Sequence, residues 1–309
     1  MLKSAKGRVR PRRHKGQEPA KSSGAGRRVL SLGRSLLIMA GTISMTTAQG
    51  GHYAAVNGLK MYYEIHGSGE PLVVLHGGLG STAMFDGILP LLGARQTIAV
   101  DLQGHGRTAD IDRPMSYEAM ADDIAGLMKT LGIQKADVMG YSLGGGAALR
   151  LAIQHPDAVR KLVLVSTTYK RDGWFPEVLA AMAQLGPAAA EMMKQSPIYK
   201  AYARIAPRPD DWPRLVTKVA DLIKKDYDWS KDVPGIRATT LLVYGDADAI
   251  RPVHMIEFYG LLGGGKKDAG WDGSAMCKAR LAILPGLTHY NIVSSPLLAS
   301  TVAAFLDAK

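Results

Sequence analysis

The feature that most constrains the fold of this chain is a repeated alternation of short, almost wholly apolar segments with helical ones. Leu72-Val-Val-Leu75 is the first such segment, and five more follow at residues 97–100, 136–139, 162–165, 240–244 and 281–284. A strand is apolar along its whole length when both faces of its sheet are covered. A buried strand followed by a helix, several times over, predicts a mostly parallel, doubly wound α/β sheet with helices on both faces.

Helices and a hairpin complete this pattern. Apolar residues recur at helical spacing over residues 117–131, 143–154 and 297–306. Ahead of the first apolar strand, residues 52–56 and 59–65 flank Asn57-Gly58, which predicts a β-hairpin with a primed turn. With the hairpin, we expect a sheet of eight strands.

One long segment interrupts the alternation. Residues 169–233 carry no buried-strand signal, but they have helical pieces near 178–185 and 215–225, separated by prolines and rich in Trp, Tyr and Met. We interpret this segment as a helical cap inserted before the next strand, so that residues 51–168 and 234–309 form the core. Residues 263–278 are a second irregular stretch, a Gly-rich loop of the length that is usually functional or mobile.

The net charge of +11 belongs to the first part of the chain. Residues 1–34 hold eleven of the 38 Lys and Arg but one of the 27 Asp and Glu, so the rest is nearly neutral and we expect no nucleic-acid binding by the folded body. Residues 1–50 read as a basic, disordered or signal-like segment. An export signal, a tether to nucleic acid or acidic membrane, and upstream sequence before a start at Met45 all remain open. A start at Met45 would favour the cytoplasm.

The strongest chemical signal is Gly140-Tyr141-Ser142-Leu143-Gly144, which follows an apolar strand and opens a helix. A sharp strand-to-helix turn holds a serine in strained backbone geometry and exposes its hydroxyl. Glycines on either side let the neighbouring backbone pass without a clash. The helix N-terminus places N–H groups beside any negative charge that develops there.

With this motif and four others, the sequence resembles the α/β-hydrolase fold superfamily from residue 52 to the end. His76-Gly77-Gly78-Leu79-Gly80 is similar to the oxyanion loop, and residues 101–108 to the turn after the next strand. Gly245-Asp246-Ala247-Asp248 resembles the acid loop, and Pro285 to His289 the histidine loop. The order Ser, Asp, His is that of this fold.

The resemblance implies a Ser-His-Asp triad of Ser142, His289 and Asp248, with Asp248 preferred over Asp246. The backbone N–H groups of Leu143 and Gly78 would form the oxyanion hole. For substrate binding we single out the side chains of Tyr141, Trp174 and Met182. A triad needs no cofactor, and no metal site is expected.

The other histidines and the single cysteine are expected to be structural. His76 would brace the oxyanion loop, His105 would lie in a glycine-flanked turn, and His155 and His254 would lie at helix ends or on the surface. Cys277 is the only cysteine, so an internal disulfide is impossible.

A serine at position 142 excludes the superfamily members that use an aspartate nucleophile, namely haloalkane dehalogenases and epoxide hydrolases. The simplest interpretation is a carboxylesterase for small to medium acyl esters that acts through an acyl-enzyme. A carbon–carbon hydrolase, a lactonase, a cofactor-free perhydrolase, a peptidase and a non-catalytic binding protein remain alternatives, because the fold does not fix the substrate. Apolar runs are too short for a membrane-spanning helix, and the oligomeric state is left open.

Overall fold

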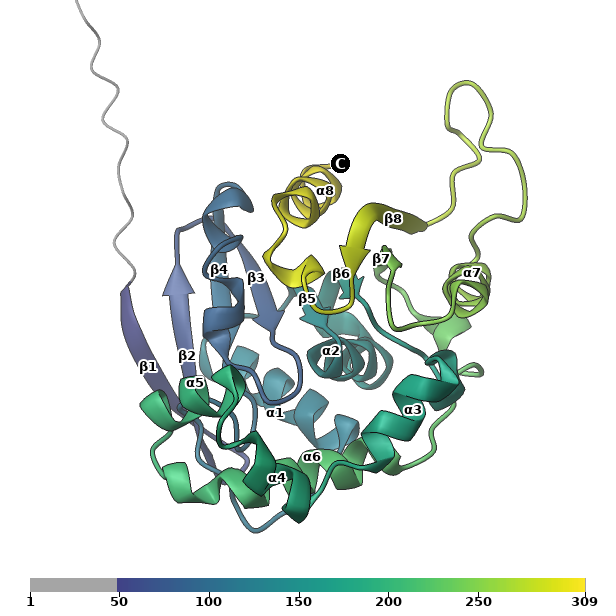
Figure 1. Ribbon diagram of the computed structural model, residues 1–309. Helices are drawn as coiled ribbons and strands as arrows, with labels where there is room; N and C mark the ends of the chain where they lie inside the picture. Colours follow the sequence, from purple (N-terminus) through teal and green to yellow (C-terminus); the bar gives the residue numbers. More distant parts are fainter. Residues whose placement is uncertain (1–48, 309) are drawn as a thin grey trace, which may run out of the picture. The chain divides into compact units, whose positions relative to one another are not determined.

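A computed structural model describes residues 49–308 of the chain (Figure 1). The expectations for the basic segment, including the possible start at Met45, lie outside these residues. Among residues 49–308, no helix combines the length and the apolar character needed to cross a membrane.

The described residues are built around one sheet of eight strands, as predicted. The strands are β1 (Gln49–Val56), β2 (Leu59–His66), β3 (Glu70–Leu75), β4 (Arg95–Val100), β5 (Ala136–Tyr141), β6 (Val159–Val165), β7 (Thr239–Ala247) and β8 (Ala279–Thr288). Their order is β1-β2-β4-β3-β5-β6-β7-β8. The pairs β1–β2 and β2–β4 are antiparallel and all the others are parallel. The predicted hairpin turn is also present, with positive φ at both Asn57 and Gly58.

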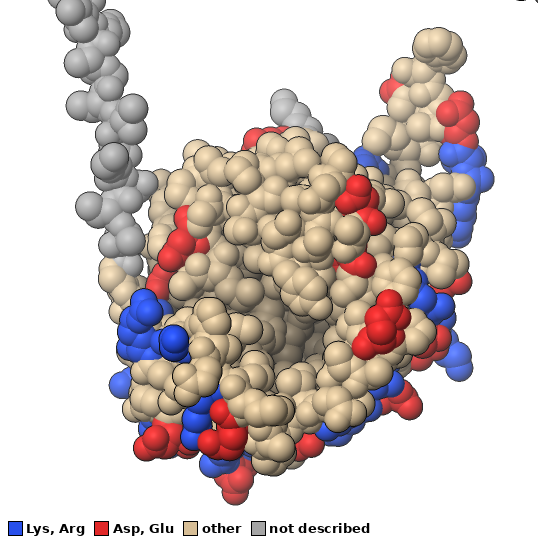
Figure 2. All heavy atoms as spheres, in the orientation of Figure 1, with Lys and Arg blue, Asp and Glu red and all other residues tan. Residues whose placement is uncertain are grey.

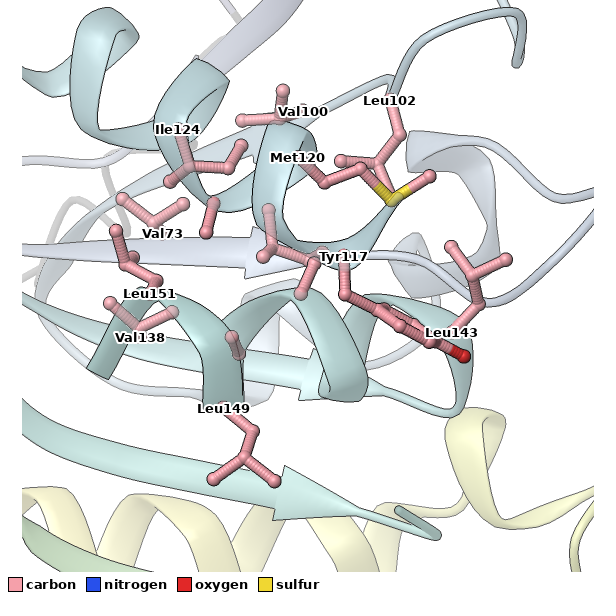
Figure 3. Packing of buried hydrophobic residues seen from close by; sticks show 14 of the residues in the cluster. Val73, Val100, Leu102, Tyr117, Met120, Ile124, Val138, Leu143, Leu149 and Leu151 are labelled. Atoms are coloured by element: carbon pink, nitrogen blue, oxygen red, sulfur yellow. The ribbon is translucent and has the colours of Figure 1, made fainter. Parts of the chain in front are cut away.

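Helices cover both faces of the sheet because neighbouring residues of each strand point to opposite sides. In β3, for example, Val73 and Leu75 belong to one buried cluster and Leu72 and Val74 to another. Residues of α1 (Tyr117–Thr130), α2 (Leu143–Gln154) and α7 (Pro252–Leu261) complete the first cluster. Those of α8 (Pro296–Asp307) and of the 3-10 turns η1 (Thr82–Phe85) and η2 (Leu89–Leu91) complete the second. Figure 3 shows the first cluster, where α1 and α2 pack beside the strands.

Four helices form the insertion between β6 and β7: α3 (Pro176–Ala183), α4 (Pro187–Met193), α5 (Pro197–Ile205) and α6 (Trp212–Lys224). The sequence indicated α3 and α6 but not α4 and α5, because we treated the prolines as breaks between helices. Pro176, Pro187 and Pro197 are instead the first residues of helices, a position where the missing N–H costs nothing. Figure 1 shows these helices at the carboxyl ends of the parallel strands.

Helix α6 fixes the insertion to the rest of the fold. Trp212 is fully buried, and its indole N–H donates to the carbonyl oxygen of Ala190 in α4 at 2.9 Å. Lys218 and Arg214 both pair with the buried carboxylate of Asp110, at 2.7 and 2.6 Å. Because two basic side chains of α6 form salt bridges with the buried Asp110, α6 is held on the loop that follows β4 by charge as well as by apolar contact.

The expected Gly-rich loop lies between α7 and β8. It extends away from the neighbouring elements in Figure 1, and Trp271 within it is fully exposed. Its residues do not reach the cavity described below.

Candidate active site

Ser142 occupies the sharp turn between β5 and α2. Its φ of 53° and ψ of −114° place a non-glycine residue in a strained region of backbone space. Two hydrogen bonds hold it there, because the Ser142 N–H donates to the carbonyl of Val165 and its carbonyl accepts from Gly146, both at 3.0 Å. Strain of this kind costs on the order of 1–3 kcal/mol and persists only where the surrounding structure imposes it.

The glycines on either side of this turn are required by close backbone contacts. A Cβ on Gly140 would lie 2.3 Å from the carbonyl oxygen of Gly144. A Cβ on Gly144 would lie 2.4 Å from the carbonyl oxygens of Leu75 and His76. No side chain fits at either position, so the strand, the turn and the helix meet at a separation that only glycine permits.

A chain of hydrogen bonds connects Ser142 to an aspartate through a histidine. The Ser142 Oγ lies 3.1 Å from Nε2 of His289, and His289 Nδ1 lies 3.0 Å from Oδ1 of Asp248. His289 is on the loop after β8, and Asp248 directly follows β7, so both come from the carboxyl edge of the sheet. Asp246 accepts instead from the N–H of Gly286 at 2.8 Å. The structure therefore brings together the three residues named from the sequence.

Sequence reasoning missed a fourth residue of this chain of contacts. Ser166 is fully buried, and its hydroxyl donates to Oδ2 of Asp248 at 2.5 Å. Its backbone is also strained, with φ of 49°. The sequence signal that could have found it is simple, since Ser166 is the first polar residue after the apolar part of β6.

Aromatic rings surround His289. The rings of Tyr141 and Trp174 lie 5.4 and 5.1 Å from it, and the more exposed Tyr290 lies 5.5 Å away. The Tyr141 hydroxyl donates to the His289 carbonyl at 2.6 Å and fixes the loop. Burial raises the pKa of Tyr141, so this hydroxyl keeps its proton. The imidazole is thus held in a largely apolar setting.

Two backbone N–H groups were proposed for the oxyanion hole. Leu143 is the first residue of α2, so its N–H is one of the helix-terminal donors that have no acceptor within the helix. Gly78 lies directly beside it, because a Cβ on Gly78 would stand 3.5 Å from Cδ1 of Leu143. Both residues line the same cavity as Ser142, so their proposed role is geometrically possible.

Ser142 and His289 open into a cavity of about 690 Å³ beneath the helical insertion. Its size is that of an ordinary small-molecule site. Tyr141, Trp174 and Met182, which we expected to bind substrate, all line it. Figure 2 shows a hollow in this face of the molecule that is surrounded mostly by uncharged residues.

Two further glycines of α2 lie against residues that line the cavity. A Cβ on Gly145 would lie 1.8 Å from Oγ1 of Thr167, and a Cβ on Gly146 would lie 2.4 Å from the ring of Tyr117. The absence of side chains at Gly145 and Gly146 therefore lets Thr167 and Tyr117 lie directly against the start of α2. Figure 3 shows Tyr117 and Leu143 in the same cluster.

Of the four other histidines considered above, three are buried and His155 is half-exposed. His76 is buried, accepts from the N–H of Leu102 at 3.1 Å and lies 2.8 Å from the carbonyl of Gly77, as a brace of the loop would. His105 is also buried, and His155 caps the end of α2. The expectation that His254 could lie on the surface was wrong. It is fully buried near the start of α7, stacked on the ring of Tyr169 at 4.3 Å.

Among residues 49–308, no cluster of three or more His, Cys, Asp or Glu side chains is arranged to hold a metal ion.

Comparisons with known proteins agree with this architecture. A family model described as the alpha/beta hydrolase fold matches residues 70–211. The pimeloyl-[acyl-carrier protein] methyl ester esterase of Neisseria meningitidis is 43% identical over 119 residues, which are 37% of this chain and 44% of that protein. The AB hydrolase superfamily protein YisY of Bacillus subtilis is 29% identical over 230 residues, which are 65% of this chain and 83% of that protein.

Solved structures agree as well. The enol-lactonase of Burkholderia xenovorans superposes with a TM-score of 0.63 at 24% identity, covering 83% of this chain and all of that one. The chain spans 34% to 46% of the length of the first curated relatives that it matches. The eight-stranded sheet, the strained turn after β5 and these similarities show that the chain has the α/β-hydrolase fold.

Proposed function

We propose that this protein is a serine hydrolase that cleaves carboxylic esters of small to medium acyl chains through an acyl-enzyme. The observation that carries this proposal is the hydrogen-bonded series Asp248–His289–Ser142, whose serine end opens into a mostly apolar cavity. A serine hydroxyl is a weak nucleophile at neutral pH and needs a base beside it. His289 Nε2 stands at the distance that such a base requires.

In the first half of the reaction, Ser142 Oγ attacks the ester carbonyl while His289 takes its proton. Asp248 holds Nδ1 and so keeps Nε2 free as the acceptor, and it stabilises the imidazolium that forms. The negative oxygen of the tetrahedral intermediate is received by the N–H groups of Leu143 and Gly78, next to the positive end of α2. His289 then returns the proton to the leaving alkoxide.

In the second half, a water molecule takes the place of the alcohol. His289 accepts a proton from this water as it attacks the acyl group, and it returns the proton to Ser142 Oγ when the acid leaves. The rings of Tyr141 and Trp174 cover the imidazole during both halves. This cover lowers the local dielectric and strengthens the contacts to the developing charges.

The size of the cavity supports the stated range of substrates. About 690 Å³ accommodates an ester of moderate size, and the cavity is bounded by Met182 and Trp174 on the insertion side. Fold alone does not select an ester over a lactone or a carbon–carbon bond, so the choice of substrate rests on the experiment.

The test is a series of p-nitrophenyl esters from acetate to palmitate with the unmodified protein and with Ser142→Ala. We expect hydrolysis of the shorter esters and a fall in kcat of at least ~10³-fold in the variant. Ser300→Ala, on the exposed side of α8, serves as the control and should change nothing. An organophosphonate should label Ser142 alone. Labelling of another serine, or undiminished hydrolysis by Ser142→Ala, would contradict the proposal.

A further inference from the structure

The cavity beside Ser142 has an unusual balance of charge. Aromatic, aliphatic and hydroxyl side chains line it, and among the described residues that do so there is no Lys or Arg. The one carboxylate is that of Glu177, which is exposed in the first turn of α3. A substrate carboxylate that entered this cavity would lose its hydration without gaining a cation, and it would meet a like charge at the insertion.

One wall of the same cavity carries three hydroxyl groups from separate parts of the chain. Tyr117 begins α1, Thr168 follows β6, and Tyr227 follows α6. The hydroxyls of Thr168 and Tyr227 lie 2.6 Å apart. The rings of Tyr117 and Tyr227 have their centres 5.5 Å apart, and both pack against Trp229. Burial raises the pKa of both tyrosines, so all three groups are neutral O–H donors.

Counting hydrogens shows what this hydroxyl wall (Tyr117, Thr168 and Tyr227) offers to a ligand. The hydrogen bond between Thr168 and Tyr227 uses one of their two hydroxyl hydrogens, and the Tyr117 hydroxyl supplies a third hydrogen. At least one O–H therefore remains to donate, on a wall where Thr168 is 2% exposed. A buried donor that has no acceptor is costly, so a ligand gains affinity when it brings an acceptor oxygen such as that of a ketone, an ether or an alcohol.

We propose that this site selects uncharged esters that carry an additional acceptor oxygen, received by Tyr117, Thr168 and Tyr227, and that it rejects esters that carry a carboxylate. The inference rests on the proposed function and specifies its substrate class. The hydroxyl wall supplies the attraction, and the absence of a cation among the lining residues, together with Glu177, supplies the rejection.

Three esters of nearly the same shape separate these effects. Ethyl 4-oxopentanoate carries the acceptor, ethyl 4-methylpentanoate replaces it with a methyl group, and monoethyl succinate replaces it with a carboxylate. The matching set in the alcohol part is 3-oxobutyl, 3-methylbutyl and 2-carboxyethyl acetate. We expect the oxo ester to exceed the methyl ester about 5-fold to 10-fold in kcat/KM in one of the two sets. The carboxylate esters should fall at least about 100-fold below the oxo esters in both.

Variants then assign the selectivity to residues. Thr168→Val and Tyr227→Phe should each lower the ratio of oxo to methyl ester toward one. Tyr199→Phe is the matched control, because its ring packs on Trp212 outside the cavity and the ratio should not change. Glu177→Lys should raise the rate on the carboxylate esters several-fold and leave the oxo to methyl ratio alone.

The outcomes distinguish this inference from the proposed function. If the methyl ester is hydrolysed through Ser142 but the carboxylate ester is hydrolysed equally well, the inference is overturned and the esterase proposal stands. The same holds if neither set favours the oxo ester, or if Thr168→Val and Tyr227→Phe both leave the ratio unchanged. If no ester of either set is hydrolysed in a Ser142-dependent way, the proposed function itself fails.

Discussion

Replacing Ser166 by alanine should impair catalysis although Ser166 does not line the cavity. The Asp248 carboxylate is buried and has three contacts: His289 at 3.0 Å, the Ser166 hydroxyl at 2.5 Å, and the more distant N–H of Gly245 at 3.3 Å. Without the hydroxyl, Oδ2 keeps only the long bond to Gly245. A hydrogen bond to a charged group contributes about 1.5–3 kcal/mol.

This free energy can be converted into an expected rate. If it is expressed in the transition state, where the imidazolium needs a correctly oriented carboxylate, kcat should fall about 10-fold to about 100-fold, since about 1.4 kcal/mol corresponds to a factor of ten. KM should change little, because Ser166 is a positioning residue that acts through Asp248. The measurement is kcat and KM for p-nitrophenyl butyrate.

Ser166→Gly is the matched variant. It also removes the hydroxyl, but it relieves the strain of a φ of 49°, so it should melt at a higher temperature than Ser166→Ala. Both variants should lose the same activity. If both retain kcat within about twofold of the unmodified protein, or if only the alanine variant is impaired, the contact with Asp248 is not what matters and the reasoning is refuted.

Two other predictions follow from the cavity and from the buried ionisable groups. Trp174→Ala should shift the preference from acetate toward octanoate esters, by about 1 kcal/mol for each methylene accommodated, and an unchanged ratio in a folded variant would show that Trp174 does not limit the acyl group. Burial lowers the pKa of His76 to about 3 and those of His105 and His254 to about 4, so the unfolded chain binds more protons and stability is lost as pH falls below 6.5. Burial raises the pKa of Asp101 to about 6, so between pH 3.8 and 6 this carboxyl group binds more protons in the folded chain than in the unfolded one. Its effect on stability is therefore opposite to that of the histidines. Near pH 5 the three histidines outweigh Asp101, so the free energy of unfolding should fall by a few kcal/mol for each pH unit of acidification, which urea titrations at pH 5 to 7 would measure and a flat profile would contradict.

Much of this fold could be predicted from the sequence because its signals are local. Short runs that are apolar on both faces, such as Leu72 to Leu75, indicate a strand and also that both of its faces are buried. The sharp turn at Ser142 could be predicted from the Gly140–Gly144 motif for the same reason, since the strand, the turn and the helix are consecutive in the sequence. The loops that carry Asp248 and His289 could be named because each has its own short motif beside a strand.

The features that escaped prediction depend on contacts between distant segments. Ser166 contacts a carboxylate 82 positions away, and no motif surrounds it. The hydroxyl wall joins Tyr117, Thr168 and Tyr227, each of which looks like an ordinary helix or loop residue in its own segment. His254 was expected to be at a helix end or on the surface, yet it is fully buried because Tyr169, from a distant segment, packs over it.

The three consecutive glycines in the first turn of α2 limit which substitutions this protein can tolerate as its substrate range evolves. Gly144, Gly145 and Gly146 each touch a different neighbour at a distance that forbids a Cβ: backbone, Thr167 and Tyr117. Each glycine also costs about 1 kcal/mol of helix propensity relative to alanine, so this helix start depends on being packed from all sides. A single substitution there would damage the nucleophile's position before it altered selectivity. We therefore expect that new substrate ranges, in the laboratory or among relatives, arise by substitution and length variation in the helical insertion from α3 to α6, while the glycine-rich start of α2 remains unchanged.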